Sequence, residues 1–375
     1  MREGWSKRKI EEIATITMGQ SPSGNSINEI NGMEFHQGKI YFGEKYIKES
    51  HFYTSDPIRF AEPNSLLLCV RAPIGVVNIT DRKICIGRGL CSIKANDSVQ
   101  YNYLYYAILS QKEYYKKNAT GSTFQAISSN VVKETPIPVP SKEKQRQIAS
   151  ELDMITEMIS KYDEQLKELD KLSQSIFYEM FGDPIENEKG WEVKKIVEIA
   201  DATIGLTYKP ENVAGNGVIV LRSGNIKNSA LDFTDILRVE TNIPSHKYVK
   251  DGDILMCTRN GSLRHVGKVA IIKNLNEQMT YGAFMTVIRS EMNPYLYGYF
   301  NTPAFRDSLI HGKTTTINQI TVKMLNETSL PIPPLPLQQS FARKIEAIEA
   351  MKSKVKEAKK EAETLFAARM QYWFE

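Results

Sequence analysis

Two arginines stand at matching places along the chain, each directly after an apolar run. Arg71 follows Leu66–Val70, and Arg259 follows Ile254–Thr258. A guanidinium group that is buried without a partner is costly, whereas an exposed one is suited to bind a phosphate or both acceptors of a guanine base. The alternative is an internal salt bridge with a nearby carboxylate. The residue types therefore predict either two arginines that face a ligand or two internal ion pairs.

Further hydrogen-bond donors stand in loops that are rich in turn-forming residues. The candidates are Gln20 and Ser21, Ser122 and Thr123, Asn225 and Lys227, Arg264 and His265, and Lys313 and Thr314. Hydroxyl, lysine and arginine groups can contact phosphates, and a glutamine can pair with adenine through two hydrogen bonds. For each of these residues, the alternative is an ordinary solvated loop position.

Common catalytic patterns are missing from the sequence. Gly312-Lys313-Thr314 lacks the first glycine of a phosphate-binding loop, because Asp307 stands in its place. The histidines show no metal-ligand spacing, and no nucleophile elbow occurs. We therefore expect no catalytic residue, no metal and no cofactor, which favours a binding protein over an enzyme.

The composition narrows the class of protein. The chain has 375 residues, of which 41% are hydrophobic and 25% charged, as in ordinary soluble proteins. It contains no apolar run long enough to span a membrane and no apolar signal core at its start. The four cysteines form no Cys-x-x-Cys pair and are expected to be reduced, buried thiols of a cytoplasmic protein. This composition excludes a membrane protein, a secreted disulfide scaffold and a disordered chain.

The chain repeats itself. Gly4-Trp5 returns as Gly190-Trp191, the run that ends in Arg71 returns as the run that ends in Arg259, and Pro136-Ile137-Pro138 returns as Pro331-Ile332-Pro333. The matches occur in the same order, which indicates a duplication. Short apolar runs separated by turn residues predict an α+β fold, with mixed α/β domains at residues 1–141 and 182–334.

A long helix is predicted after each domain, over residues 142–181 and 335–375. Apolar residues recur in both with alternating spacings of four and three, as in a coiled-coil seam. The seam positions are Ile148, Leu152, Ile155, Ile159, Tyr162, Leu166 and Leu169 in the first segment, and Ile345, Ile348, Val355, Ala362 and Phe366 in the second. Lys352 and Lys359 also occupy seam positions and weaken the second seam. The first segment is net acidic and the second net basic, which favours pairing between them, and the repeated order of domain and helix favours an antiparallel arrangement. The alternative is that each helix packs onto its own domain.

Over its full length, the chain resembles the specificity subunit of type I restriction–modification systems. The resemblance rests on the two Gly-Trp starts, on the motif Val70–Gly75, and on the Pro-Ile-Pro stretches that lead into a glutamine and a long helix. In the family, the connector before the helix commonly reads Pro-Pro-Leu-x-Glu-Gln. Here Gln338 replaces that Glu in the second copy, and the first copy lacks the Leu.

This resemblance implies two target recognition domains, separated by two helices that form an antiparallel coiled coil with an internal pseudo-two-fold repeat. Each domain would recognise one half of a split sequence in double-stranded DNA. If so, the arginines and loop donors named above are the residues that we expect to contact the DNA. The helices would set the spacer between the halves and dock two modification subunits, which methylate adenine with S-adenosylmethionine. Restriction subunits would add ATP-dependent cleavage, and the chain itself would be non-catalytic.

A coiled-coil scaffold that assembles other proteins without recognising DNA is the main rival prediction. The two domains share frame motifs but differ in their loops. Two unlike half-sites would explain that divergence, whereas a symmetric scaffold gives no reason for it.

Overall fold

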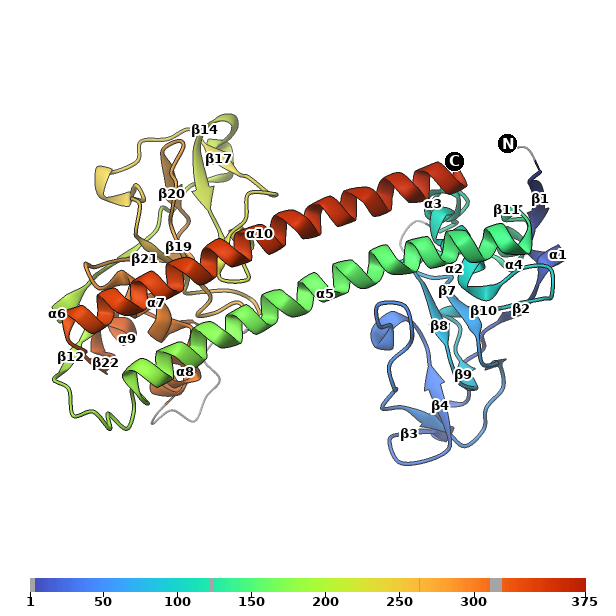
Figure 1. The fold of residues 1–375 in the computed structure, drawn as a ribbon, viewed down its shortest axis with the longest axis horizontal. Helices are drawn as coiled ribbons and strands as arrows, with labels where there is room; N and C mark the ends of the chain where they lie inside the picture. The colour runs from blue at the N-terminus through green and yellow to red at the C-terminus, as the bar shows by residue number, and fades with distance from the viewer. Residues whose placement is uncertain (1–3, 122–124, 263, 311–318) are drawn as a thin grey trace. The chain divides into compact units, whose positions relative to one another are not determined.

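A computed structural model describes residues 4–121, 125–262, 264–310 and 319–375. The chain divides into two compact units (Figure 1). Unit 1 contains residues 1–163 and 357–375, and unit 2 contains residues 164–356. Each unit therefore combines one globular part with a portion of both long helices.

The main sheet of unit 1 is antiparallel and has the strand order β2-β10-β7-β8. Its strands are β2 (Ala14–Met18), β7 (Ser65–Cys69), β8 (Val77–Thr80) and β10 (Leu90–Ala95). Every residue of β7 is buried, as expected for a strand that carries the apolar run Leu66–Cys69. Helix α2 (Tyr101–Ser110) packs on this sheet through buried side chains that include Tyr103, Leu104 and Tyr106.

Smaller elements complete unit 1. A second sheet has the order β3-β5-β4-β9-β6, and β1 pairs with β11. The strands are β1 (Ser6–Lys9), β3 (Ile27–Asn28), β4 (Met33–His36), β5 (Tyr53–Thr54), β6 (Phe60–Ala61), β9 (Ile84–Ile86) and β11 (Pro136–Val139). The short helices are α1 (Ile10–Ile13), α3 (Lys112–Lys117) and α4 (Ser129–Lys133).

Unit 2 repeats this plan with the antiparallel order β13-β21-β18-β19. The main strands are β13 (Asp201–Ile204), β18 (Ile254–Cys257), β19 (Val269–Ile271) and β21 (Met285–Arg289). The other strands are β12 (Val193–Lys195), β14 (Val213–Leu221), β15 (Ile226–Lys227), β16 (Ala230–Leu231), β17 (Arg238–Val239), β20 (Met279–Tyr281) and β22 (Ser329–Pro331). The helices are α6 (Ile196–Ile199), α7 (Asn293–Phe300), α8 (Pro303–Ile310) and α9 (Val322–Glu327). The matching strand orders confirm the predicted internal repeat and α+β fold.

The two long helices are α5 (Lys142–Phe181) and α10 (Leu335–Phe374). In unit 1 the early part of α5 contacts the late part of α10, as in the ion pair Glu151–Arg369. In unit 2 the late part of α5 contacts the early part of α10, as in the ring contact Phe177–Phe341. The helices therefore run antiparallel within each unit, as predicted. None of the described helices is apolar over a length that would cross a membrane.

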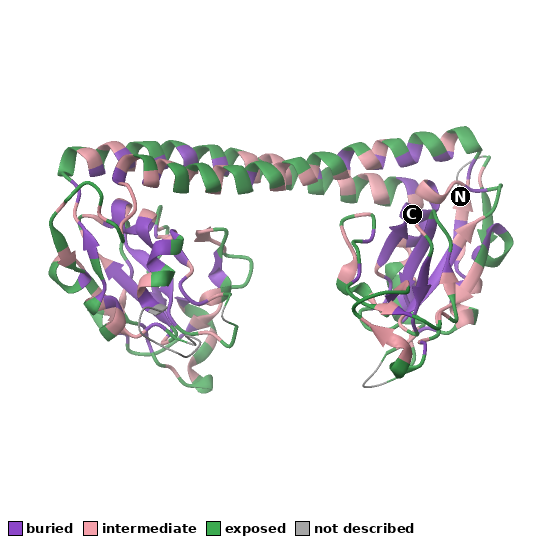
Figure 2. Cartoon of the chain, turned by 90° about the horizontal axis from the view of Figure 1, so that it is seen from below, coloured by how far each residue is buried: buried purple, intermediate pink, exposed green. Residues whose placement is uncertain are grey.

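Buried residues concentrate in the sheets of each globular part and on the faces of the long helices that pack together (Figure 2). In unit 1 this core includes Ile148 and Leu152 from α5, and Trp373 from α10. In unit 2 it includes Phe177 from α5, and Phe341 and Ile345 from α10. Within each unit, the globular part and the helix portions that belong to it therefore share one apolar core.

The cysteines allow a direct test of the packing. Cys69, Cys85, Cys91 and Cys257 are free and buried, as predicted from the sequence. Burial raises the pKa of Cys69 and Cys91 to about 12 and that of Cys257 to about 11. Because the thiolate is the reactive form, we expect no fast reaction with a thiol-specific chromogenic disulfide at pH 8, and reaction of all four thiols in guanidinium chloride. A thiol that reacts within seconds in native buffer would contradict this packing.

Candidate nucleic-acid interface

In unit 1, three strand ends meet at one edge of the main sheet. Cys91 pairs with Met18 and Leu90 pairs with Cys69, so β2 and β7 end beside the start of β10. Gln20 and Arg71 follow the ends of β2 and β7, and Arg88 precedes β10. Together with Ser21, these residues form what we call the unit 1 edge. The structure thus brings the candidates Gln20 and Ser21 to the same edge as Arg71, which lies far from them in the sequence.

Backbone contacts hold the unit 1 edge in place. The Gln20 amide donates to the Ile86 carbonyl (3.0 Å), and the Val70 amide donates to the Gly89 carbonyl (3.0 Å). The Arg88 amide donates to Ser21 Oγ at 3.4 Å. A Cβ atom at Gly19 would collide with the carbonyl oxygen of Gly87, so only glycine allows this close approach. The polar side chains are therefore carried on a well-ordered frame.

Arg71 is exposed and forms no ion pair with any carboxylate of the described residues. Its backbone forms an isolated bridge with Ala126, which also pairs with Thr120. The predicted candidates Ser122 and Thr123 stand between Thr120 and Ala126 in the sequence and lie outside the described residues. For Arg71, the contacts in the described part of the chain favour the ligand-facing alternative over the internal salt bridge.

Unit 2 has the same edge with different side chains. Ile204 pairs with Thr286 and Cys257 pairs with Met285, so Arg259 stands at the end of β18, beside Phe284, which precedes β21. We call Arg259, Asn260 and Phe284 the unit 2 edge. The Arg259 guanidinium lies over the Phe284 ring, 5.3 Å from its centroid.

Arg259, like Arg71, is exposed and has no carboxylate partner within the described ranges. Its backbone bridges to Gln319, just as that of Arg71 bridges to Ala126. The predicted candidates Lys313 and Thr314 precede Gln319 and lie outside the described residues. The two arginines thus occupy equivalent structural positions, as the repeat predicts.

The structure corrects the assignment of Asn225. Its side chain is 2% exposed. Asn225 Oδ1 accepts from the Arg222 amide (2.8 Å), and Nδ2 donates to the carbonyl oxygens of Asp232 and Asp235, both at 2.9 Å. No group of this side chain is left for DNA, so Asn225 has a structural role in its turn.

Replacing Asn225 by alanine is therefore expected to destabilise unit 2 by about 1–3 kcal/mol, because buried backbone groups lose their partners. Urea unfolding of the full chain measures this loss. Lys227→Ala in the same turn is the matched control, expected to stay within about 0.5 kcal/mol of wild type. Unchanged stability of Asn225→Ala together with altered DNA specificity would restore the original assignment.

Three other candidates in unit 2 lie on or near its surface. Lys227 is exposed, and its Nζ contacts Asp232 Oδ1 and Thr234 Oγ1, both at 3.0 Å. Arg264 is exposed, and His265 is half-buried in the same turn. The turn that holds Asn225 is tied to the unit 2 edge, because Asn260 Nδ2 donates to Ser223 Oγ at 2.9 Å.

The helix seams lie where the sequence places them. Ile148, Leu152, Ile155, Leu166, Ile345, Ile348 and Ala362 are buried, and Ile159, Tyr162, Leu169, Val355 and Phe366 are half-buried. The two seam lysines are also at the helix contact. In unit 1, Lys359 Nζ lies 2.6 Å from Asp163 Oδ1.

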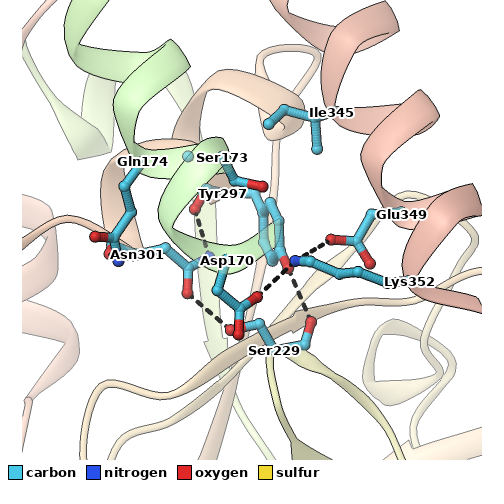
Figure 3. A pocket seen from close by; sticks show the side chains of 10 residues that line it. Asp170, Ser173, Gln174, Ser229, Tyr297, Asn301, Ile345, Glu349 and Lys352 are labelled. Atoms are coloured by element: carbon cyan, nitrogen blue, oxygen red, sulfur yellow. Dashed lines mark hydrogen bonds and ion pairs between the residues drawn. The ribbon is translucent and has the colours of Figure 1, made fainter. Parts of the chain in front are cut away.

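Lys352, the seam lysine of unit 2, is 4% exposed. Its Nζ lies 2.6 Å from Asp170 Oδ1 on α5 and 2.9 Å from Glu349 Oε1 on α10. Burial lowers the pKa of Lys352, but the hydrogen bonds to the two carboxylates outweigh it, so the pKa is raised. Figure 3 shows this group beside Tyr297 in a cavity of about 130 Å³. The lysine is therefore a paired charge inside the seam and not a defect in it.

Sequence reasoning missed Arg88, Phe284 and Asn260, which belong to the two edges. The sequence offered one signal, since each stands within three residues of an apolar run that became a central strand. It gave no indication that Asp163 and Asp170 would pair with the seam lysines. Among the described residues, no cluster of three or more histidine, cysteine or acidic side chains could hold a metal.

The fold and its edges define a class of protein: two repeated α+β units joined by antiparallel helices, with an exposed arginine at the same sheet edge of each. The model of the type I restriction modification DNA specificity domain matches residues 2–170 and 188–363, once in each half of the repeat. The chain belongs to this family.

Relatives and a solved structure agree with this assignment. One relative is named as the MjaX type I restriction enzyme specificity subunit of Methanocaldococcus jannaschii. It is 35% identical over 168 residues, and the alignment covers 44% of this chain and 39% of that protein. The MjaIX specificity subunit of the same organism is 30% identical over 228 residues, 54% of this chain and 52% of that protein. The alignments thus span about two-fifths to one-half of the length of these relatives.

The S subunit of a type I restriction-modification system from M. genitalium has a similar fold. Its TM-score is 0.57 at 18% identity, with 98% of this chain and 95% of that chain covered.

Proposed function

We propose that this chain recognises double-stranded DNA as the specificity subunit of a type I restriction–modification complex. The observation that carries the proposal is the pair of equivalent sheet edges, each with an exposed arginine that has no carboxylate partner among the described residues. Half or more of protein–DNA hydrogen bonds go to phosphates, and bidentate arginine–guanine pairs are the commonest specific contact. Membership of the specificity-domain family supports the same function.

Each globular part would recognise one half of a bipartite sequence. The unit 1 edge supplies Gln20, Ser21, Arg71 and Arg88, and unit 2 supplies Arg259 with Arg264, His265 and Lys227 nearby. Ser122, Thr123, Lys313 and Thr314 remain candidates for phosphate contacts. Leu206 is the residue of unit 2 that corresponds to Gln20. The Gln20 amide donates to the Ile86 carbonyl in β9, and the Leu206 amide donates to the Tyr281 carbonyl in β20. Unlike side chains on a common frame fit two unlike half-sites.

The antiparallel helices would separate the two recognition domains and thereby set the spacer between the half-sites. They would also dock two modification subunits, which methylate adenine, and restriction subunits would join them in the full complex. We assign no catalytic residue and no cofactor to this chain. For the two recognition domains we propose residues 1–141 and 182–334, and for the two helical spacers residues 142–181 and 335–375. The cellular location that we propose is the cytoplasm.

A methylome map tests this function. The chain is co-expressed with its modification subunit in a host that lacks adenine methylation, and the modification subunit alone is the control. We expect a split motif with methylated adenines that appears only when this chain is present. Methylation that is identical without the chain, or a stable complex without any new motif or sequence-specific binding of duplex DNA, would favour the rival scaffold function.

A further inference from the structure

The unit 2 edge carries a large aromatic ring that the core does not use. Phe284 is 57% exposed. It lies at the end of the sheet where Arg259 also stands, and the guanidinium of Arg259 lies over its ring at 5.3 Å. An exposed phenylalanine on a loop gains little from burial in the free chain, so packing within the unit does not account for its position.

The backbone of Phe284 is fixed in place. Its carbonyl oxygen accepts from the amides of Thr258 (3.0 Å) and Arg259 (3.1 Å), and from Thr258 Oγ1 at 3.1 Å. Thr258 is buried and belongs to the segment that continues β18. The ring is therefore presented on a rigid support and not on a loosely held loop.

The equivalent position in unit 1 has no side chain. The Val70 amide donates to the Gly89 carbonyl as the Thr258 amide donates to the Phe284 carbonyl, so Gly89 and Phe284 correspond. Arg88, beside Gly89, is exposed, whereas Ala283 stands beside Phe284. The frame of the edge thus does not require an aromatic residue, and its chemistry differs between the units: a second cation in unit 1 and an apolar ring in unit 2.

We infer that Phe284 makes an apolar contact with the methyl group of a thymine in the half-site recognised by unit 2, next to the base pair or phosphate bound by Arg259. This inference rests on the proposed function. The thymine methyl is the apolar feature of the major groove, and aromatic side chains are among its usual partners. The ring–guanidinium contact would also restrict the orientations of Arg259 before DNA binds, since the two groups are already in contact.

The test compares thymine with uracil, which lacks only the methyl group. Once the methylome has given the motif, each thymine of the unit 2 half-site is replaced in turn by deoxyuridine in a duplex. Binding to the complex of this chain with its modification subunit is measured by fluorescence anisotropy. For wild type we expect one position at which deoxyuridine weakens binding about fourfold, the loss expected for one buried methyl group.

Three variants identify the residue responsible. In Phe284→Ala the thymine and uracil duplexes should bind equally, whereas Phe284→Leu, which keeps an apolar side chain, should retain part of the preference. Val197→Ala is the matched control, because Val197 is 55% exposed on α6, before β13, and so away from the strand ends that form the unit 2 edge. Thermal unfolding of each variant confirms that it folds.

The outcomes separate this inference from the proposed function. A specific motif whose unit 2 half-site shows no sensitivity to deoxyuridine, or contains no thymine, overturns the role of Phe284 and leaves DNA recognition standing. A sensitivity that persists unchanged in Phe284→Ala also overturns it. Absence of any sequence-specific binding overturns the inference together with the proposed function.

Discussion

Replacing Arg71 or Arg259 by alanine is expected to weaken binding to the specific duplex by about 1–3 kcal/mol, the usual value of one good bidentate pair. The folding stability should stay within about 0.5 kcal/mol of wild type, as for other surface changes. The reason is that both side chains are exposed and neither pairs with a carboxylate in the described part of the chain. Fluorescence anisotropy of the assembled complex measures the first quantity, and urea unfolding the second.

The lysine variants separate the two kinds of contact. If an arginine binds a phosphate, Arg→Lys should keep most of the affinity, and Arg→Ala should weaken binding to all sequences and reduce the salt dependence by the equivalent of about one phosphate. If it binds guanine through two hydrogen bonds, Arg→Lys should relax the preference at one base pair, because lysine lacks the planar fork. Arg71 variants should affect one half-site and Arg259 variants the other.

Equal losses of affinity and stability in the alanine variants would contradict this assignment. They would instead indicate that the arginine is part of an internal ion pair, the alternative that the sequence leaves open. Arg8→Ala is a suitable control in unit 1, since Arg8 is an exposed arginine whose partner is Glu12 in the same short segment.

The repeat and the long helices were predictable because each leaves a periodic trace in the sequence. The runs before Arg71 and Arg259 match because they form the equivalent buried strands β7 and β18 of the two units. The seam positions follow from the geometry of helix packing. These features depend on spacing within one segment. They are also the features that the structure confirms most directly.

The error at Asn225 has a physical cause. A loop asparagine that caps a turn and one that faces a ligand have the same residue type and the same neighbours in sequence. The difference lies in the carbonyl groups of Asp232 and Asp235, which only the folded turn brings to its amide. Phe284 and Arg88 were missed for a similar reason, because their place at the edges depends on the register of strands that are far apart in the chain.

The partners of the seam lysines were likewise not predictable from the sequence alone. Periodicity alone suggested that Lys352 weakens the helix contact, because a lysine in an apolar seam normally costs stability. Asp170 lies on the other helix, nearly half the chain away in sequence, and its approach to Lys352 requires the antiparallel register. The Lys352–Asp170 pair therefore depends on the antiparallel register of the two helices within unit 2.

Removing the carboxylates around Lys352 is expected to cost unit 2 about 3 kcal/mol. Asp170→Ala combined with Glu349→Ala leaves a buried ammonium group without a counter-charge, and breaking a buried pair typically costs 3–5 kcal/mol. We expect the lower end of that range because Asp170 is 42% exposed. Replacing the lysine alone, in Lys352→Met, should cost less than removing both carboxylates, because the carboxylates left without a cation are still partly hydrated: Asp170 is 42% and Glu349 24% exposed.

The pH dependence gives this prediction a second signature. The pKa of Lys352 is raised above its ordinary value of 10.5 in the folded chain. The unfolded chain therefore loses its proton first, and the stabilisation is fully present below pH 10.5 and is lost as the pH rises through the higher, folded pKa. Above pH 10.5, wild type should consequently lose stability relative to Lys352→Met. Urea unfolding of both proteins in the same buffers measures this change.

A triple variant tests whether the lost stability comes from the unpaired lysine. Adding Lys352→Met to the two carboxylate replacements should restore most of the lost stability, because no buried charge then remains unpaired. A triple variant as unstable as the double one would show that Asp170 and Glu349 stabilise unit 2 through contacts other than Lys352. Glu168→Ala serves as the control on the same helix, since Glu168 is exposed and pairs only with exposed Lys171 among the described residues.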